Sequence, residues 1–439
     1  MTNSPDLAAK PTPSAAATDS SPTHPSSPVY PDQRQAWMVV AGMAVSLCIL
    51  FGSTLNSFGV FIPPITQTFL STNEESANIA SAFMLTMTLA MPLAGWLLDR
   101  IGPRAVMSSG AVLMGLGYFL ASMSNDISSI TLAMAVSGAG VGASTYIPSI
   151  ALVMRWVDLK HQGLALGLML SGGSIGAMIF PMLLTHITEL YNWRVAMQFI
   201  ATLALLVCVP ILLWLARLPQ QPLPDSNQTS NLQNLSGKSI GQALRMPRYW
   251  LWVGVQILAT LSTLGIIVNV IPYLISVGYS PQEAATMFAF KSVAGLLGSF
   301  TFGVLSSRWD IKPLLMVGMA IGGFGIFALL LGNDPSFGFG AIVAFTVAWG
   351  ATFNLVNQLS PMLMEETVGQ RNFGTLLGIG NLIAGVGAAF SPKLIGYLLD
   401  TSGNYSTALM LCAACMIAAL IPLAFLPKRI PVSSTEQAQ

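Results

Sequence analysis

Long apolar runs alternate with short polar breaks from Ala36 to the end of the chain. A helix needs about 20 apolar residues to cross the hydrocarbon core of a membrane. The runs meet that length and show no strand-like alternation, which argues against a β-barrel. We therefore predict an all-α membrane protein with twelve transmembrane helices in two six-helix halves. The predicted spans are residues 36–60, 76–98, 104–124, 128–154, 162–185, 194–217, 249–275, 284–306, 312–332, 337–364, 372–398 and 404–426.

The segments outside these spans differ in composition. Residues 1–35 are rich in Pro, Ser, Thr and Ala, and such a segment buries too little apolar surface to fold. Residues 218–248 form the longest internal break and are rich in Pro, Gln, Asn and Ser. We expect a disordered cytoplasmic tail over 1–35, six-helix halves over 36–217 and 249–426, a cytoplasmic linker over 218–248 and a cytoplasmic tail over 427–439.

The two predicted halves repeat one another. A first set of residues recurs after 208 positions and a second set after 211 positions. The first set pairs Gly95, Arg100 and Arg104 with Gly303, Arg308 and Lys312, and the second pairs Gly163, Gly167, Gly176 and Pro181 with Gly374, Gly378, Gly387 and Pro392. An internal duplication of this kind is typical of transporters built from repeats.

Composition narrows the function classes. Hydrophobic residues make up 53% of the chain and charged residues only 8%, whereas soluble proteins carry about 25% charged residues. The sequence has no H-E-x-x-H or P-loop segment, so we expect no enzyme activity, cofactor or metal. Because 18 Lys and Arg balance 17 Asp and Glu without a basic cluster, we expect no nucleic-acid partner.

The placement of Lys and Arg predicts the topology. With the N-terminus inside, 15 of the 18 cationic residues fall in cytoplasmic segments. Only Arg194 falls outside, while Lys291 and Lys393 lie within spans. We therefore expect a multi-pass protein of the inner (plasma) membrane with both termini in the cytoplasm.

The segment GWLLDRIGPR, Gly95–Arg104, follows the second predicted span. It resembles the G-x-x-x-D-R-x-G-x-R signature of the major facilitator superfamily. That resemblance implies a conformational motif in which the aspartate pairs with a neighbouring helix end and latches the two halves in one state. The motif residues are Gly95, Asp99, Arg100, Gly102 and Arg104, with Arg308 in the second copy, where Ser307 replaces the aspartate.

Four further segments are similar to the monocarboxylate-transporter and oxalate/formate-antiporter group of that superfamily. They are PDQRQAWMVV (31–40), RWVDLKHQGLALGLMLSGGSIG (155–176), IPYLISVGYSPQEA (271–284) and SPKLIGYLLDTSGNYS (391–406). The group commonly carries an arginine at the position of Ser299, and some members carry an acidic partner at the position of Gly295. Its animal members use a lysine at the position of Asn56. The charged binding residues of the group are therefore replaced here.

Lys291 lies about seven residues into the eighth predicted span. A charge at that depth is expensive and usually marks a substrate or ion path. No acidic residue lies deep in a span, so an anionic ligand is the natural counter-charge. We expect Lys291 to bind the anion and to couple anion to proton, since each would favour binding of the other. The alternative is a lysine that reaches the membrane surface from a helix with a different start.

Uncharged polar residues accompany Lys291 at similar depths. They can hydrogen-bond to substrate oxygens, or they can form interhelical hydrogen bonds that only support the fold. The predicted substrate-binding set comprises Lys291, Asn56, Tyr146, Asn269, Tyr273, Asn354, Asn357 and Asn381, and Gln358 lies at a comparable depth.

These observations together predict a secondary active transporter. The family resemblance implies that it moves small organic anions, mono- or dicarboxylates, by alternating access, as a proton symporter or as an antiporter. One alternative is efflux of a neutral or hydrophobic compound by the same fold. Another is a membrane sensor that keeps the fold without transport. We expect a monomer whose partners are the substrate, protons and the lipid bilayer.

Overall fold

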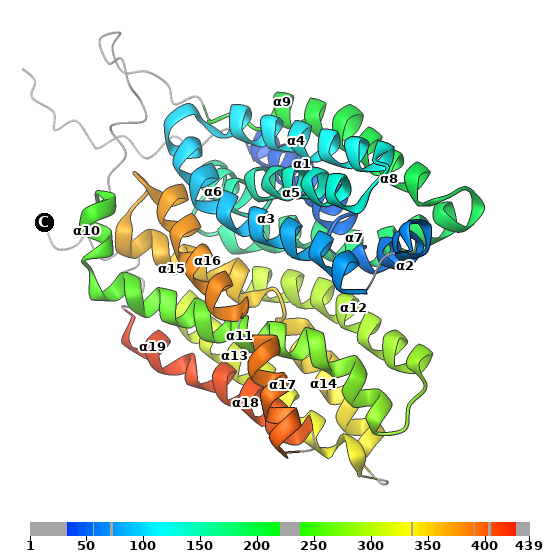
Figure 1. Ribbon diagram of the computed structural model, residues 1–439. Helices are drawn as coiled ribbons and strands as arrows, with labels where there is room; N and C mark the ends of the chain where they lie inside the picture. Colours follow the sequence, from blue (N-terminus) through cyan, green and yellow to red (C-terminus); the bar gives the residue numbers. More distant parts are fainter. Residues whose placement is uncertain are drawn as a thin grey trace, which may run out of the picture.

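A computed structural model of the chain describes residues 33–55, 57–70, 73–219, 238–334, 337–389, 391–402 and 405–426. The described residues are almost entirely helical and form two bundles that lie side by side (Figure 1). The predicted tails, most of the predicted linker and Asn56 lie outside the described residues, and the side chain of Lys393 is not described either.

The first bundle contains α1 to α9, the upper bundle of Figure 1. Its helices are α1 (Gln33–Gly52), α2 (Phe58–Phe69), α3 (Asn73–Ile101), α4 (Pro103–Met123), α5 (Ile127–Ser144), α6 (Tyr146–Trp156), α7 (Gln162–Leu190), α8 (Trp193–Leu203) and α9 (Val209–Leu215), with a π-helical turn at Ala204–Cys208 between the last two.

The second bundle contains α10 to α19. Its helices are α10 (Ile240–Leu244), α11 (Pro247–Ser276), α12 (Pro281–Ser306), α13 (Ile311–Ala328), α14 (Gly338–Thr352), α15 (Leu355–Val368), α16 (Phe373–Ala389), α17 (Ser391–Ser402), α18 (Tyr405–Ala418) and α19 (Leu420–Phe425), with a 3₁₀ turn at Leu329–Asn333 after α13.

The prediction of an all-α membrane fold is confirmed. Among the described residues, eleven helical segments are long and apolar enough to cross a membrane, and each overlaps a predicted span. The remaining predicted span, residues 372–398, is divided between α16 and α17, and its apolar helical part covers only Phe373–Gly387.

Two spans that the sequence predicts as continuous are broken near the middle. Residues 128–154 divide into α5 and α6 at Thr145, and residues 337–364 divide into α14 and α15 at Phe353 and Asn354. The breaks lie at nearly equivalent places in the duplicated sequence. Helix breaks at membrane depth expose backbone groups and persist where the helix faces protein or a cavity.

The bundles contact one another mainly where α3 crosses α16 and where α7 crosses α12. Glycines allow both crossings. A Cβ atom on Gly95 would lie 2.1 Å from the carbonyl oxygen of Gly374, and one on Gly303 would lie 2.9 Å from Cα of Leu164, next to Gly163. Small residues let membrane helices approach to backbone contact. The duplicated glycines of the sequence thus form two equivalent helix crossings between the bundles.

Candidate functional site

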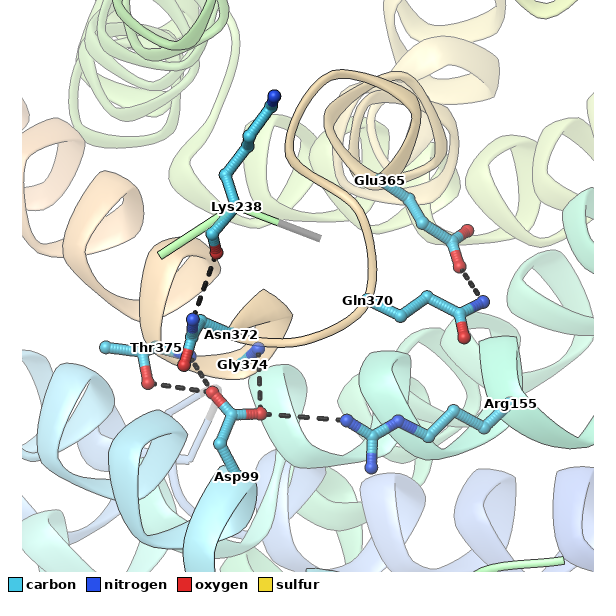
Figure 2. A network of polar contacts seen from close by, with 8 residues as sticks. All are labelled: Asp99, Arg155, Lys238, Glu365, Gln370, Asn372, Gly374 and Thr375. Atoms are coloured by element: carbon cyan, nitrogen blue, oxygen red, sulfur yellow. Dashed lines mark hydrogen bonds and ion pairs between the residues drawn. The ribbon is translucent and has the colours of Figure 1, made fainter. Parts of the chain in front are cut away.

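Asp99, at the end of α3, reaches across to the first turn of α16 in the other bundle (Figure 2). Its Oδ1 accepts a hydrogen bond from the backbone N of Gly374 at 3.3 Å. Its Oδ2 accepts two more from Thr375, from the backbone N at 2.8 Å and from Oγ1 at 2.7 Å. The first N–H groups of a helix lack partners within the helix and carry partial positive charge. The carboxylate therefore caps α16 and ties the bundles together.

Arg155 balances the charge of this buried carboxylate. It lies in the last turn of α6, and its Nη2 is 3.6 Å from Oδ1 of Asp99. The side chains are only 6% exposed for Asp99 and 10% exposed for Arg155. Glu365, at the end of α15, also attracts the Arg155 charge and accepts a hydrogen bond from Gln370 at 2.5 Å. We call Asp99, Arg155, Gly374 and Thr375 the latch.

The other predicted motif residues do not join the latch. Gly102 has φ +85° at the start of α4, which favours glycine, and Pro103 follows as the first helical residue. Arg100 lies over the Trp96 ring at 4.0 Å and is exposed. Arg104 and Arg308 are also exposed. The latch partners Arg155 and Thr375 were missed because the sequence shows a cation at a span end without showing which residue faces it.

The described end of the predicted linker, which begins at Lys238, is attached beside the latch. The backbone N of Lys238 donates to the carbonyl oxygen of Val368 at 2.8 Å. Asn372 donates from Nδ2 to the carbonyl oxygen of Lys238 at 3.0 Å (Figure 2). Val368 is the last residue of α15, and Asn372 lies in the loop before α16. The loop that presents Gly374 and Thr375 to Asp99 is therefore held from both sides.

Lys291 occupies a different place, deep in the second bundle. It follows the first residue of α12 by ten positions, which corresponds to about 15 Å along the helix. Its Nζ lies 4.0 Å from the ring centroid of Phe353, 4.6 Å from that of Phe288 and 5.7 Å from that of Trp349. Among the described residues no carboxylate lies within ion-pair distance of it. Its charge thus meets aromatic faces and no counter-ion in this part of the chain.

Three of the predicted binding residues use their polar groups within the second bundle. Asn269 donates to the carbonyl oxygen of Gly265 at 2.9 Å, and Asn381 donates to that of Leu377 at 2.8 Å. The hydroxyl of Tyr273 donates to the carbonyl oxygen of Leu329 at 2.6 Å. Tyr146, which begins α6, packs edge-on against Phe51 at 4.9 Å. Asn357 lines a cavity together with Phe353.

Asn354 and Gln358 connect the bundles at the α7–α12 crossing. Asn354 lies 3.2 Å from Oγ of Ser174 on α7 and 3.3 Å from Oγ of Ser299 on α12. One turn further, Nε2 of Gln358 donates to the carbonyl oxygens of Gly163 at 2.8 Å and of Ser299 at 3.0 Å. Ser299, at the position where the resembled group carries an arginine, therefore contacts the amide side chains of Asn354 and Gln358. Lys291, which has no carboxylate within ion-pair distance among the described residues, lies two turns away on α12.

Comparisons with known proteins agree with this architecture. A family model described as Major Facilitator Superfamily matches residues 42–392 and 270–439. Monocarboxylate transporter 13 of Bos taurus is 26% identical over 406 residues, which is 90% of each chain. Monocarboxylate transporter 12 of Homo sapiens is 25% identical over 423 residues, 90% of this chain and 81% of that protein. The resemblance inferred from the motifs is thus confirmed.

Solved structures show the same fold. A Major Facilitator Superfamily transporter, FucP, in the outward conformation superposes with a TM-score of 0.70 over 90% of this chain and 100% of that chain, at 18% identity. A crystal structure of the E. coli fucose:proton symporter FucP gives a TM-score of 0.69 at 18% identity, with the same coverage.

Proposed function

We propose that this chain, which belongs to the Major Facilitator Superfamily and is a multi-pass membrane transporter, moves small organic carboxylates across the inner (plasma) membrane. The observation that carries this proposal is Lys291, a cation at membrane depth that faces three aromatic rings and no carboxylate in the described chain. The names of the relatives, monocarboxylate transporters 12 and 13, support the same substrate class.

The energetics of Lys291 favour an anionic ligand. A lysine at the centre of a membrane helix costs about 2.5–3.5 kcal/mol on insertion scales. A cation–π contact contributes about 0.5–2 kcal/mol. The rings of Phe353 and Phe288 therefore offset part of the cost and hold the ammonium in place without neutralising it. A carboxylate from the substrate supplies the missing charge through a charge-assisted hydrogen bond.

The latch and the glycine crossings give this protein a means of alternating access. The latch closes the end of the molecule that contains Arg155, and the excess of Lys and Arg at this end supports a cytoplasmic position for it. Opening that end breaks the Asp99 contacts with Gly374 and Thr375. The α3–α16 and α7–α12 crossings then serve as pivots. Glycines at these crossings have no side chains that interdigitate, so one bundle can rotate against the other.

Lys291 also provides a route to coupling. In a symport cycle, the carboxylate stabilises the charged amine, so anion and proton bind with positive linkage and leave together. In an exchange cycle, Lys291 stays charged and one anion replaces another. Neither route requires a carboxylate inside the membrane, which agrees with spans that lack deep acidic residues.

Reconstituted vesicles and a panel of labelled mono- and dicarboxylates test the proposal. We expect Lys291→Gln to abolish carboxylate uptake while the folded protein remains in the membrane, and Lys291→Arg to keep binding but lose proton dependence. Lys160→Gln, on an exposed loop, is the matched control and should transport at the parental rate.

Other outcomes identify the alternatives. Parental uptake and an unchanged pH profile in Lys291→Gln would contradict the role of Lys291. Counterflow of an uncharged drug without any carboxylate would instead support efflux of neutral compounds. Binding without counterflow would support a sensor.

A further inference from the structure

A cavity of about 80 Å³ lies inside the second bundle, beside the break between α14 and α15. Its walls come from α11, α13, α14, α15 and α18, and from Phe353 at the break. Four Thr and Asn side chains line it within predicted membrane spans: Thr260 and Thr263 on α11, Thr352 at the end of α14 and Asn357 on α15. No charged side chain lines this cavity.

The hydrogen bonding of Thr260, Thr263 and Asn357 differs from that of Thr352 in the same cavity and from that of other threonines and asparagines in the described helices. Thr346 donates its hydroxyl to the carbonyl oxygen of Ile342 at 2.8 Å, and Thr352 to that of Ala348 at 3.0 Å, as threonines in helices usually do. Asn269 and Asn381 bond to their own helices in the same way. Thr260, Thr263 and Asn357 have no such partner among the described residues and instead line the cavity.

Polar groups left without partners at membrane depth are costly, because lipid offers no hydrogen bonds. Thr260 and Thr263 are three residues apart and therefore share one face of α11, which packs against α15 and its Asn357. Hydroxyls and an amide both donate and accept, so together they suit an uncharged oxygen group such as a hydroxyl or a carbonyl.

The size of the cavity limits that group. A cavity of about 150 Å³ binds benzene. A volume of about 80 Å³ is roughly half as large and therefore holds a group of about three or four heavy atoms. It admits a short chain end and excludes an aromatic ring.

The cavity and Lys291 share one side chain. The Phe353 ring lines the cavity and also lies 4.0 Å from Nζ of Lys291. An atom in van der Waals contact with that ring, at about 4 Å, lies within about 10 Å of the ammonium. A single flexible substrate can therefore place its carboxylate at Lys291 and its other end in the cavity.

We propose that this cavity is a substrate subsite, formed by Thr260, Thr263 and Asn357, for an uncharged oxygen group at the far end of a carboxylate. The preferred substrate is then a short-chain acid with a hydroxyl or keto group about four to six bonds from the carboxylate, a length that matches this separation. This inference rests on the proposed transport of carboxylates with Lys291 as their binding group.

Two labelled acids of equal length, hexanoate and 6-hydroxyhexanoate, test the subsite in vesicles that contain the full chain. We expect the unaltered protein to transport 6-hydroxyhexanoate with about three- to tenfold higher kcat/KM, the effect of one or two neutral hydrogen bonds. In Thr263→Val, Thr260→Val and Asn357→Leu, the ratio of kcat/KM for the two acids should fall towards one. Because the readout is a ratio, a lower amount of folded protein does not change it.

Thr346→Val is the matched control, since Thr346 lies on α14 and bonds its own helix. It should keep the parental ratio. If the unaltered protein transports both acids equally, the cavity holds only water and the subsite is wrong. A hydroxyl preference that survives all three subsite substitutions also overturns it. Absence of any hexanoate transport, or transport independent of Lys291, instead contradicts the proposed function.

Discussion

At the scale of single residues, the charged side chains of Asp99 and Lys291 differ in their interaction partners. Asp99 is almost completely buried, and its oxygens receive the N–H groups of Gly374 and Thr375 and face Arg155. Lys291 meets only aromatic faces among the described residues. Buried charges without partners are costly. The first residue is therefore structurally satisfied in this conformation, while we propose that the second binds a ligand.

We predict that Asp99→Asn weakens closure at the latch. Asparagine keeps the shape but loses the charge, and hydrogen bonds to charged groups contribute about 1.5–3 kcal/mol each. A cysteine at Leu98, which is 1% exposed, should then react at least tenfold faster with an impermeant maleimide. The measurement needs a background without the native cysteines.

Asp126→Asn provides the control for the latch. Asp126 caps α5 by accepting a hydrogen bond from the backbone N of Ser129 at 2.8 Å, and its side chain makes no hydrogen bond or ion pair with the described residues of the second bundle. Labelling at Leu98→Cys should be unchanged by it. If Leu98→Cys reacts at the same rate with and without Asp99→Asn, capping of α16 by Asp99 does not control closure.

At the scale of elements, the helix crossings depend on backbone proximity. The α3–α16 crossing brings Gly95 against Gly374, and α7–α12 brings Gly163 and Gly167 against Gly303 and Ser299. Interiors at this density cannot absorb an added methyl group without movement. The crossings therefore need glycine for contact distance, independently of any special backbone angle.

We predict that Gly95→Ala reduces transport at least tenfold. The new Cβ would lie 2.1 Å from the carbonyl oxygen of Gly374, so α3 and α16 must separate. Such separation also moves Asp99 away from the first turn of α16. Initial uptake rates in vesicles, normalised to folded protein, measure the effect.

Gly340→Ala, on α14, has open space around the added Cβ and should transport at the parental rate. Parental transport by Gly95→Ala as well would show that close contact at this crossing is dispensable.

At the scale of the whole molecule, the contacts between the two bundles are distributed unevenly along the length of the helices. Polar contacts join the described parts of the two bundles at two places. One is the latch, and the other is the α7–α12 crossing, where Gln358 and Asn354 form hydrogen bonds. Few element contacts join the bundles elsewhere. This distribution is that of a molecule closed at the latch end.

We predict that the latch end faces the cytoplasm. Reporter proteins fused after residue 439 or inserted within residues 218–248 should lie in the cytoplasm. At both positions a fluorescent protein should fluoresce, and alkaline phosphatase should be enzymatically inactive. The physical basis is the concentration of Lys and Arg in these segments. A fusion at Asn125, between α4 and α5, should give the opposite pattern. Active phosphatase in the 218–248 segment would overturn this orientation.

The sequence by itself determined the spans, the duplication, the family and the depth of Lys291. These features follow from local requirements, because every backbone group in lipid must bond within its own helix and a span needs a minimum apolar length. The motif around Asp99 was recognisable for a related reason, since the turn at Gly102 and Pro103 is a local structure. Each of these conclusions needs only the order of residues along the chain and no knowledge of which helices pack together.

Only the tertiary structure decided which polar groups have partners. Asn269 and Asn381 bond to their own helices, Asn354 bridges two others, and Asn357 lines a cavity, yet all four are the same residue type at similar depth. Thr260 and Thr263 were likewise indistinguishable from other threonines. A sequence specifies donors and acceptors, but the partner of each depends on which helix faces it and at what distance. That choice is made by the packing of the two bundles.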